Sequence, residues 1–350
     1  MTAKERVSRA LGHLPADRVP RYDIFLPEFT GEWARQKNMA DINIYDFYKN
    51  IDIGGVLADA GGPLTRKARV IKREGPDITE IDGFGRTLFR SEIRYFEKQL
   101  APAFYEKTGY DKLVFDDPDD LARYEPLARH AADVSRRFAP VSGVMGLFMA
   151  LYRMRGEEQL LADIAEDPGF VCHMAARLCG FIKKQAVHVA RATWTFETAL
   201  WIYDEFSSRL SPLFSPKHFE TVFMPYYKDL CAHLHENGIK RIILHCDGNC
   251  LPFYDMFIEA GFDGHQGLAP TAGMKLWEIK KIYGKRFALI GGMCNIETLA
   301  GGGRREIEYE AAAILEAARD GGVIIGTHSI DINIPLRNYQ YYYDYLESRI

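Results

Sequence analysis

The sequence predicts an α/β protein that folds as a (β/α)8 barrel, and three observations support this. From about residue 140 onward, short β-rich apolar runs alternate with longer segments of helical period, which indicates β–α units and a parallel sheet. About eight such runs are present in the chain, the number that closes a barrel. The chain has 350 residues, 47% of them apolar, enough for a large core. An open doubly wound sheet is the alternative fold.

Eight apolar runs are the expected strands, two early in the chain and six from residue 140 onward. In order they cover residues 19–26, 51–59, 140–148, 197–205, 239–247, 261–268, 286–295 and 321–329. Helices are expected between the later strands, and two of them have clear start signals. Residues 167–192 begin with Asp-Pro and residues 215–238 with Ser-Pro, in each case an N-cap residue followed by proline at the first helical position.

Residues 68–103 interrupt this alternation. They alternate apolar and polar residues and contain glycine turns, the pattern of an antiparallel meander. We therefore expect a β insertion near the N-terminus that lies over one mouth of the barrel. The chain contains no internal repeat or low-complexity linker, and a single domain over residues 1–350 is expected.

Composition excludes several classes of partner. The net charge is −4 and the basic residues are spread along the chain, so nucleic acid is not an expected partner. The N-terminus lacks the apolar segment of a signal peptide, and the apolar runs fall short of the roughly 20 residues that span a bilayer. A cytoplasmic protein without a membrane partner is expected. The six cysteines are scattered and are predicted to be reduced thiols.

Polar and titratable residues gather where the predicted strands end. In a (β/α)8 barrel the chemistry lies at the carboxyl ends of the strands, so these residues are the candidate site. They are Tyr203, Asp204, Glu205, His245, Asp247, Asn249, His265, Cys294 and His328.

Strand geometry separates the residues of the stretch HCDGNC, residues 245–250. Side chains alternate between the two faces of a strand, so His245 and Asp247 point the same way and Cys246 points toward the surrounding helices. Cys250 lies beyond Gly248 in the following loop, which disfavours a redox pair of the two cysteines.

His245 and Asp247 offer nitrogen and oxygen ligands to a metal ion. His328 and Glu205 could complete a set suited to Zn²⁺ with one open position. The alternative is that these side chains only form hydrogen bonds at a strand end.

Other candidates have simpler alternatives. Asp23 and Glu28 follow the first strand and either face the pocket or serve as a helix cap or surface residues. The glycines at 301–303 precede a helix and either cradle a phosphate or form a flexible connection. The tyrosines between 339 and 345 form either a ligand wall or helix packing.

Several motifs in the same order resemble the uroporphyrinogen decarboxylase superfamily. They are the opening AKERVSRALGHLPADRVP, the stretch GVMGLFMALYRMRGEEQLLADIAEDPGFV, the segment YDEFSSRLSPLFSPKHFETVFMPYYKDL, and the later IILHCDGN and GGVIIGTHSIDINIPLRN. The resemblance spans nearly the whole chain and implies a TIM barrel with its active site at the mouth.

Departures from the family pattern distinguish its two chemistries. True decarboxylases carry an arginine-rich RQAGRY stretch after the first strand, where this chain reads RYDIFLPEFTGEW. The acidic residues there would repel a porphyrinogen polycarboxylate. Corrinoid-linked methyltransferases that act on a thiol bind zinc through H-x-C and a later cysteine. Here the matching positions are His245, Asp247 and His328.

The resemblance therefore implies the first methyltransferase of an O-demethylase system. Such an enzyme moves a methyl group from a methoxylated, often aromatic, small molecule to the cobalt of a separate corrinoid protein. No corrinoid-binding D-x-H-x-x-G module is present in the chain, so cobalamin is expected on a partner corrinoid protein. A harder nitrogen and oxygen set suits an ether oxygen better than a thiol.

The expected roles follow from this resemblance. The expected metal ligands for zinc are His245, Asp247, Glu205 and His328. The expected catalytic residues are Asp204, Glu205, His265 and Tyr203, and the expected substrate contacts are Asp23, Glu28, Asn249 and Cys294. The alternatives are a uroporphyrinogen-type decarboxylase, a methylcobalamin:thiol methyltransferase, and a silent barrel that binds a corrinoid or tetrapyrrole.

Overall fold

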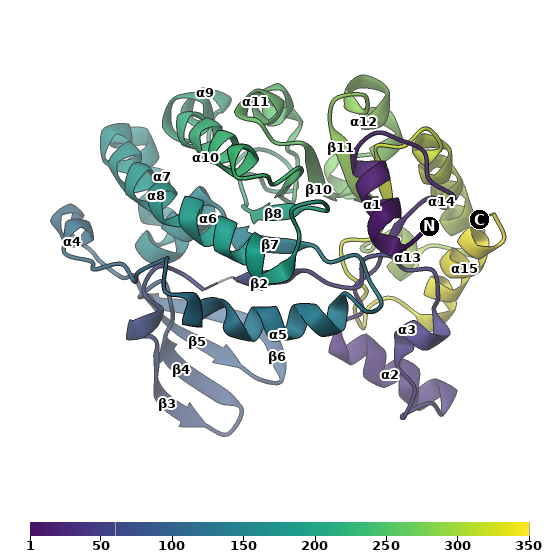
Figure 1. Cartoon of the computed structure of the whole chain (residues 1–350). Helices are drawn as coiled ribbons and strands as arrows, with labels where there is room; N and C mark the ends of the chain where they lie inside the picture. The colour runs from purple at the N-terminus through teal and green to yellow at the C-terminus, as the bar shows by residue number, and fades with distance from the viewer. Residues whose placement is uncertain (60, 350) are drawn as a thin grey trace.

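The computed structural model describes residues 1–59 and 61–349, with the side chains of 94–96 outside that description. Residues 60 and 350, which the predicted domain 1–350 includes, therefore lie outside the described part. Eight parallel strands form one curled sheet in the order β1-β12-β11-β10-β9-β8-β7-β2 (Figure 1). The strands are β1 (Arg21–Tyr22), β2 (Leu57–Asp59), β7 (Ser142–Met145), β8 (Leu200–Tyr203), β9 (Ile242–His245), β10 (Gly264–Leu268), β11 (Ala288–Gly292) and β12 (Val323–Gly326).

The sheet closes between β1 and β2, the two strands at its edges. Tyr22 of β1 forms a parallel bridge with Ile53, just before β2. The Ile53 amide donates to the carbonyl of Arg21 at 3.0 Å, and the Asp23 amide donates to the carbonyl of Ile53 at 3.2 Å. These bonds join the two edges of the sheet, so the predicted (β/α)8 barrel is confirmed and the open doubly wound sheet is wrong.

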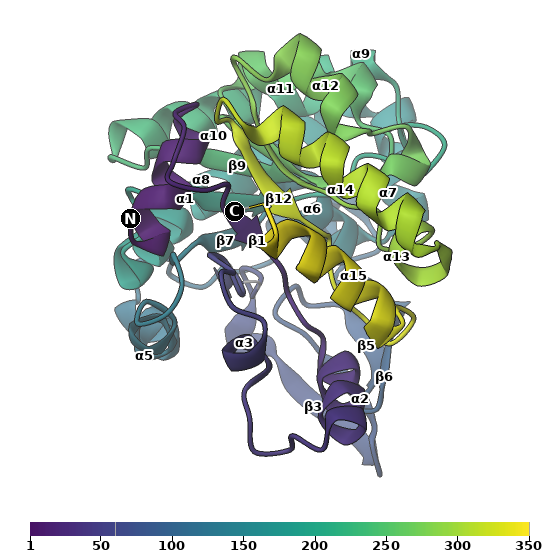
Figure 2. The same cartoon turned by 90° about the vertical axis from the view of Figure 1, so that its right-hand side faces the viewer.

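Helices surround the barrel (Figures 1 and 2). They are α1 (Ala3–Leu11), α2 (Pro27–Lys37), α3 (Ile44–Phe47), α4 (Lys107–Asp111), α5 (Glu125–Val134), α6 (Leu147–Arg155), α7 (Glu157–Glu166), α8 (Pro168–Thr193), α9 (Pro216–His218), α10 (Met224–Glu236), α11 (Tyr254–Ala260), α12 (Leu276–Tyr283), α13 (Thr298–Gly301), α14 (Arg304–Ala318) and α15 (Leu336–Glu347). A π-helical stretch joins α9 to α10.

The two predicted helix starts are present. The side chain of Asp167 accepts from the Phe170 amide at the start of α8, and that of Ser215 accepts from the His218 amide at the start of α9. Each cap satisfies an amide that the helix itself cannot bond. Within the described residues, no helix has both the length and the apolar character needed to cross a membrane.

The predicted insertion is a separate four-stranded antiparallel sheet. Its strands are β3 (Arg69–Glu74), β4 (Asp77–Ile81), β5 (Thr87–Ser91) and β6 (Arg94–Ala101), paired in chain order. This insertion follows the carboxyl end of β2, and α2 and α3 follow that of β1. Figure 1 shows both segments on the same side of the barrel. They therefore extend the molecule beyond the mouth of the barrel.

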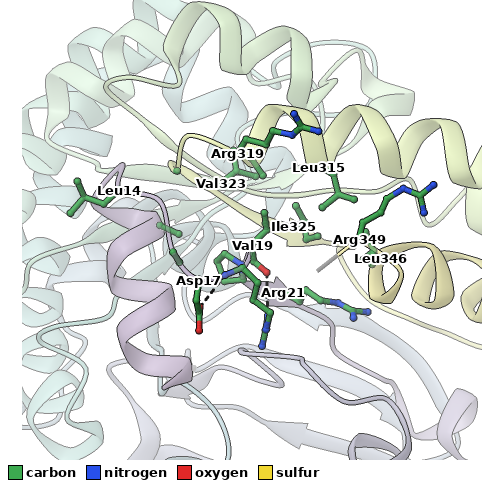
Figure 3. A pocket seen from close by; sticks show the side chains of 16 residues that line it. Leu14, Asp17, Val19, Arg21, Leu315, Arg319, Val323, Ile325, Leu346 and Arg349 are labelled. Atoms are coloured by element: carbon green, nitrogen blue, oxygen red, sulfur yellow. Dashed lines mark hydrogen bonds between the residues drawn. The ribbon is translucent and has the colours of Figure 1, made fainter. Parts of the chain in front are cut away.

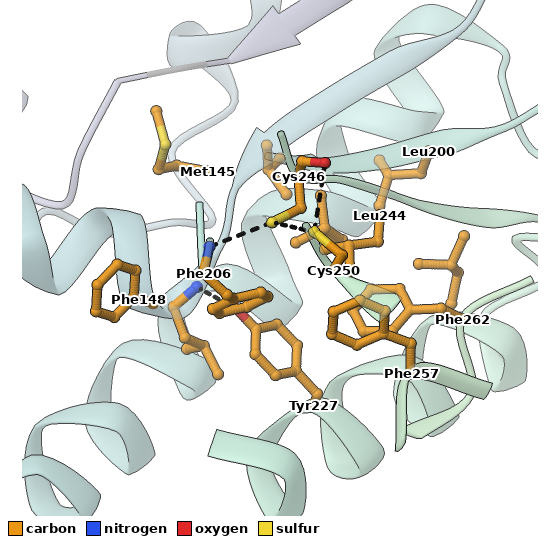
Figure 4. Packing of buried hydrophobic residues seen from close by; sticks show 14 of the residues in the cluster. Met145, Phe148, Leu200, Phe206, Tyr227, Leu244, Cys246, Cys250, Phe257 and Phe262 are labelled. Atoms are coloured by element: carbon orange, nitrogen blue, oxygen red, sulfur yellow. Dashed lines mark hydrogen bonds between the residues drawn. The ribbon is translucent and has the colours of Figure 1, made fainter. Parts of the chain in front are cut away.

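The core has two layers because strand side chains alternate between faces. Inside the barrel pack Tyr22, Trp201, Ile243, Ile290 and Ile324, among others. The opposite faces of the strands pack against the helices. Figure 4 shows that outer layer, in which Leu244 and Cys246 of the β9 segment meet the rings of Tyr227 and Phe257. The inner layer fills the barrel below the mouth.

Candidate metal centre at the barrel mouth

Three side chains from two strand ends meet inside the carboxyl-terminal mouth. His245 ends β9, Asp247 follows two residues later, and His328 lies two residues beyond the end of β12. Because Ile243 and Ile324 point into the barrel, the two-residue period directs all three side chains inward as well. One nitrogen or oxygen atom from each of the three lies within 4.8 Å of the other two.

The ring of His245 is held from both of its nitrogens. The register between β9 and β10 places Gln266 beside His245, and the Gln266 side-chain oxygen accepts a hydrogen bond from Nδ1. On the other side, Nε2 lies 3.5 Å from Oε1 of Glu205. The ring of His328 lies next to it, with 5.3 Å between the ring centroids.

The charges of this cluster favour a cation. Burial alone would lower the pKa of His245, but its hydrogen bond with Glu205, the Asp247 carboxylate and Gln266 together raise this pKa to about 9. Burial and the neighbouring His245 lower the pKa of His328. At neutral pH the two carboxylates thus hold a proton on one imidazole, while the other imidazole is neutral.

The donor set fits a zinc ion. Two imidazole nitrogens and one carboxylate oxygen form a common catalytic zinc set, which leaves a fourth position open. Gln266 holds the proton on Nδ1 of His245, as the outer hydrogen-bond partners of zinc-bound histidines do, and so directs Nε2 toward the centre. The side chains of His328 and Asp247 are 41% and 42% exposed, so these two donors are accessible from the mouth.

Glu205, the fourth expected ligand, lies beside this group of three. Its Oε2 accepts from the Asp247 amide at 3.2 Å while Oε1 faces His245. It therefore connects two of the expected ligands, and direct contact with a metal at the centre remains a prediction.

Tyr203 and Asp204 end β8 on opposite faces of the barrel wall. The Tyr203 ring faces the mouth, 5.0 Å from that of His245. Asp204 points outward, is fully buried, and accepts from the amides of Phe148 and Met149 at 3.2 and 2.7 Å. The Tyr227 hydroxyl also donates to it. Burial raises the pKa of Asp204 to about 7 against these donors. Its contacts thus hold the start of α6 against β8.

His265 also lies behind the wall. Its Nε2 donates to the carbonyl of Cys246 at 2.8 Å, and its Nδ1 lies 2.8 Å from the Tyr254 hydroxyl. Because a carbonyl only accepts, the proton sits on Nε2 and the tyrosine donates to Nδ1. The two other residues expected to be catalytic, Tyr203 and Glu205, lie in the mouth, whereas His265 and Asp204 do not.

The expected substrate contacts after β1 are not in the mouth together. Asp23 is fully buried on the outer face, where it accepts from the Tyr339 hydroxyl at 3.2 Å. The guanidinium of Arg21 lies 3.8 Å from it and pairs with Glu347 at 2.6 Å. Glu28 is exposed in the first turn of α2.

Asn249 and Cys294 follow β9 and β11. The side-chain oxygen of Asn249 is buried and has no hydrogen-bond partner among the described residues. Cys294 is buried, and its sulfur accepts from the Glu297 amide at 3.3 Å. Their roles in substrate binding remain predictions.

Sequence reasoning missed two features of this region. Gln266 was passed over for its neighbour His265, although the alternation along β10 decides which of the two faces inward. Cys246 faces the helices as expected, but Cys250 lies beside it, with 3.3 Å between the two sulfurs. The turn at Gly248, which has φ +79°, brings Cys250 back under the strand end.

A separate cavity of about 200 Å³ lies at the opposite end of the wall (Figure 3). Leu14 and Val19 line it before β1, Leu315 and Arg319 line it before β12, and Arg349 lines it after α15. Because the loops that enter β1 and β12 form it, this cavity belongs to the amino ends of the strands and does not share the mouth.

Comparison with known proteins places this chain in a family. The model of the family "Uroporphyrinogen decarboxylase (URO-D)" matches residues 101–348. Forty chains of known structure match as well. One is a methyltransferase from Methanosarcina mazei, with a TM-score of 0.68 over 99% of both chains and 15% sequence identity, a likeness that shows the fold. No curated protein matches the sequence.

Proposed function

This chain belongs to the uroporphyrinogen decarboxylase (URO-D) family, and from that premise we propose that it is a methyltransferase. The proposed donor is a methoxylated small molecule, aromatic in the first instance, and the acceptor is the cobalt of a partner corrinoid protein. In the reaction the methyl carbon–oxygen bond breaks and a cobalt–carbon bond forms. The oxygen keeps the electron pair of the broken bond and takes up a proton.

The observation that carries this proposal is the donor set at the mouth. His245, Asp247 and His328 present nitrogen and oxygen atoms within 4.8 Å of one another. Bound there, zinc would act as a Lewis acid that weakens the methyl–oxygen bond by drawing charge from the ether oxygen. A set without thiolates suits this hard oxygen better than a soft thiol substrate.

The other mouth residues support the same reaction. Gln266 keeps the His245 proton on Nδ1, so Nε2 remains turned toward the centre. The Tyr203 ring, 5.0 Å from that of His245, offers an apolar wall for an arene. Glu205 lies beside the centre, with Oε1 3.5 Å from Nε2 of His245, where its carboxylate can keep that imidazole in position.

A porphyrinogen decarboxylase reaction is less compatible with this mouth. Its substrate carries several carboxylates, which need cationic partners. The mouth instead carries the carboxylates of Glu205 and Asp247, which would repel the substrate. Arg21, the arginine nearest the expected binding stretch, is 1% exposed and pairs with Glu347 outside the wall.

The proposal is tested by methyl transfer in solution. The zinc-loaded protein would be mixed with a Co(I) corrinoid protein and a panel of methoxyarenes, and cobalt methylation would be followed by its absorbance change. We expect the phenol and the methylated corrinoid to appear in equal amounts. No transfer from any methoxylated donor, together with release of CO2 from uroporphyrinogen, would show that the decarboxylase reading is correct.

Two variants make this assay specific. His245→Ala removes a proposed ligand and should abolish transfer. Glu28→Gln changes an exposed carboxylate on α2 and tests whether Glu28 contacts the substrate. A transfer rate equal to that of the parent excludes this contact.

A further inference from the structure

We propose that Cys246 and Cys250 form a buried dithiol that a peroxide converts to a disulfide, and that this oxidation weakens metal binding at the mouth. The second half of this inference rests on the proposed function, whereas the first half does not. Figure 4 shows the two sulfurs next to each other, and both lie near the carbonyl oxygen of Asp247.

The two thiols lie close enough to each other to form a disulfide within the chain. Their sulfur atoms are 3.3 Å apart and both residues are 0% exposed. A disulfide requires about 2.05 Å between sulfurs, so each sulfur needs to move by well under an ångström. The tight turn at Gly248, which has φ +79°, brings the two cysteines together. Glycine is needed there because a Cβ would clash with the carbonyl oxygen of Ser208.

The thiols also support the backbone of the proposed metal ligand. The Sγ atoms of Cys250 and Cys246 lie 3.3 and 3.6 Å from the carbonyl oxygen of Asp247, where each thiol can donate to it. A disulfide has no S–H, so oxidation removes both donors at once. The Asp247 peptide loses its support while its carboxylate still has to reach the centre.

The oxidation balances with one molecule of hydrogen peroxide. One thiolate sulfur attacks a peroxide oxygen, so an S–O bond forms, the O–O bond breaks and hydroxide leaves. The second sulfur then attacks the first, so the S–S bond forms and the S–O bond breaks. The two sulfurs lose two electrons in total, the peroxide gains them, and the two thiol protons leave in two molecules of water.

Access for a small oxidant lies through the loop between the two cysteines. The Asp247 side chain is 42% exposed, so this loop reaches the surface at the mouth. Apart from the contacts of the two thiols, hydrogen bonds hold this loop in place. The Asn249 amide donates to the Ser208 carbonyl at 2.9 Å, and the Asp247 amide donates to the Glu205 carboxylate at 3.2 Å. Few bonds therefore need to open before peroxide reaches the sulfurs.

The test measures the oxidation of one peptide and the affinity of the protein for zinc. The reduced full-length protein is treated with hydrogen peroxide, alkylated and digested with trypsin, which releases residues 242–275 with Cys246 and Cys250 as their only cysteines. We expect this peptide to become lighter by two hydrogen atoms and to resist alkylation. A peptide that stays fully alkylatable while the half-buried Cys172 is oxidised overturns the proposal.

Zinc affinity, measured on the same samples, tests the coupling. Oxidation should weaken zinc binding at least tenfold, and a phosphine reductant should restore it. Cys250→Ser should abolish the effect of peroxide, and Cys231→Ser, which changes a buried thiol on α10, should respond as the parent does. Equal affinity of the oxidised and reduced parent overturns the coupling. If the reduced parent binds no zinc, the proposed function fails as well, while the peptide still decides whether the disulfide forms.

Discussion

Replacing Gln266 by methionine tests how the mouth is organised. The Gln266 side chain is 1% exposed, and its oxygen accepts from Nδ1 of His245. Methionine has a similar volume and no acceptor of comparable strength. The substitution therefore removes the hydrogen bond that fixes the tautomer and orientation of His245, without opening a cavity.

The size of the effect follows from that one bond. A hydrogen bond to a charged or metal-bound group contributes about 1.5–3 kcal/mol, which corresponds to roughly 10- to 150-fold in affinity. Loss of an outer partner of a zinc ligand costs about 10–100-fold. We therefore expect Gln266→Met to weaken zinc binding by about one to two orders of magnitude.

The assay is a zinc titration against a chromophoric chelator at fixed pH. Gln266→Glu is the matched variant, because its carboxylate accepts from Nδ1 at least as well as the amide and should retain or strengthen zinc binding. Unfolding midpoints of all three proteins show whether the fold is intact. A folded Gln266→Met protein with zinc affinity within twofold of the parent would show that Gln266 does not orient His245 for zinc binding.

Three further predictions concern pH and stability. Because the pKa of His245 is about 9, zinc must displace the proton of this imidazole at neutral pH. Zinc affinity should therefore rise about tenfold per pH unit between pH 6 and 8. An affinity independent of pH in competition titrations would contradict this prediction. Asp204→Asn should lower the free energy of unfolding by about 2–4 kcal/mol, because the new amide would face N–H and O–H donors in a buried site. Urea unfolding measures this loss. The control is Glu28→Gln, whose free energy of unfolding should stay within about 0.5 kcal/mol of the parent. Asp52→Ala should cost about 3–5 kcal/mol, because it removes the buried carboxylate that pairs with Arg6 at 2.6 Å and with Arg18 at 2.7 Å. A midpoint like that of the parent in thermal unfolding would disprove it.

The fold could be predicted because its signals are repeated along the chain. The alternation of apolar runs with helical segments, and the Asp-Pro and Ser-Pro starts, specify most barrel elements. The strands are shorter than the predicted runs; the run over 19–26 gives only Arg21–Tyr22 as β1. The run continues past the strand because Asp23 and Phe25 are buried by helix packing as well.

The candidate site could be predicted only in part. His245, Asp247 and His328 were identified because they share the inward face at strand ends. Asp204 and His265 carry equally reactive groups, but one residue of register turns each of them behind the wall. The path of the loop after β9 also depends on its contact with Ser208. This contact is distant in sequence, so no local pattern predicts it. The proximity of Cys250 to Cys246 was therefore hidden.

The zinc content of the purified protein is the most direct test of the proposed metal centre. Elemental mass spectrometry would compare the parent with His245→Ala, and Glu28→Gln would serve as the folded control. We predict close to one zinc per chain in the parent and in Glu28→Gln, and almost none in His245→Ala. A parent that stays metal-free after incubation with zinc, or a His245→Ala protein that retains the ion, would contradict it.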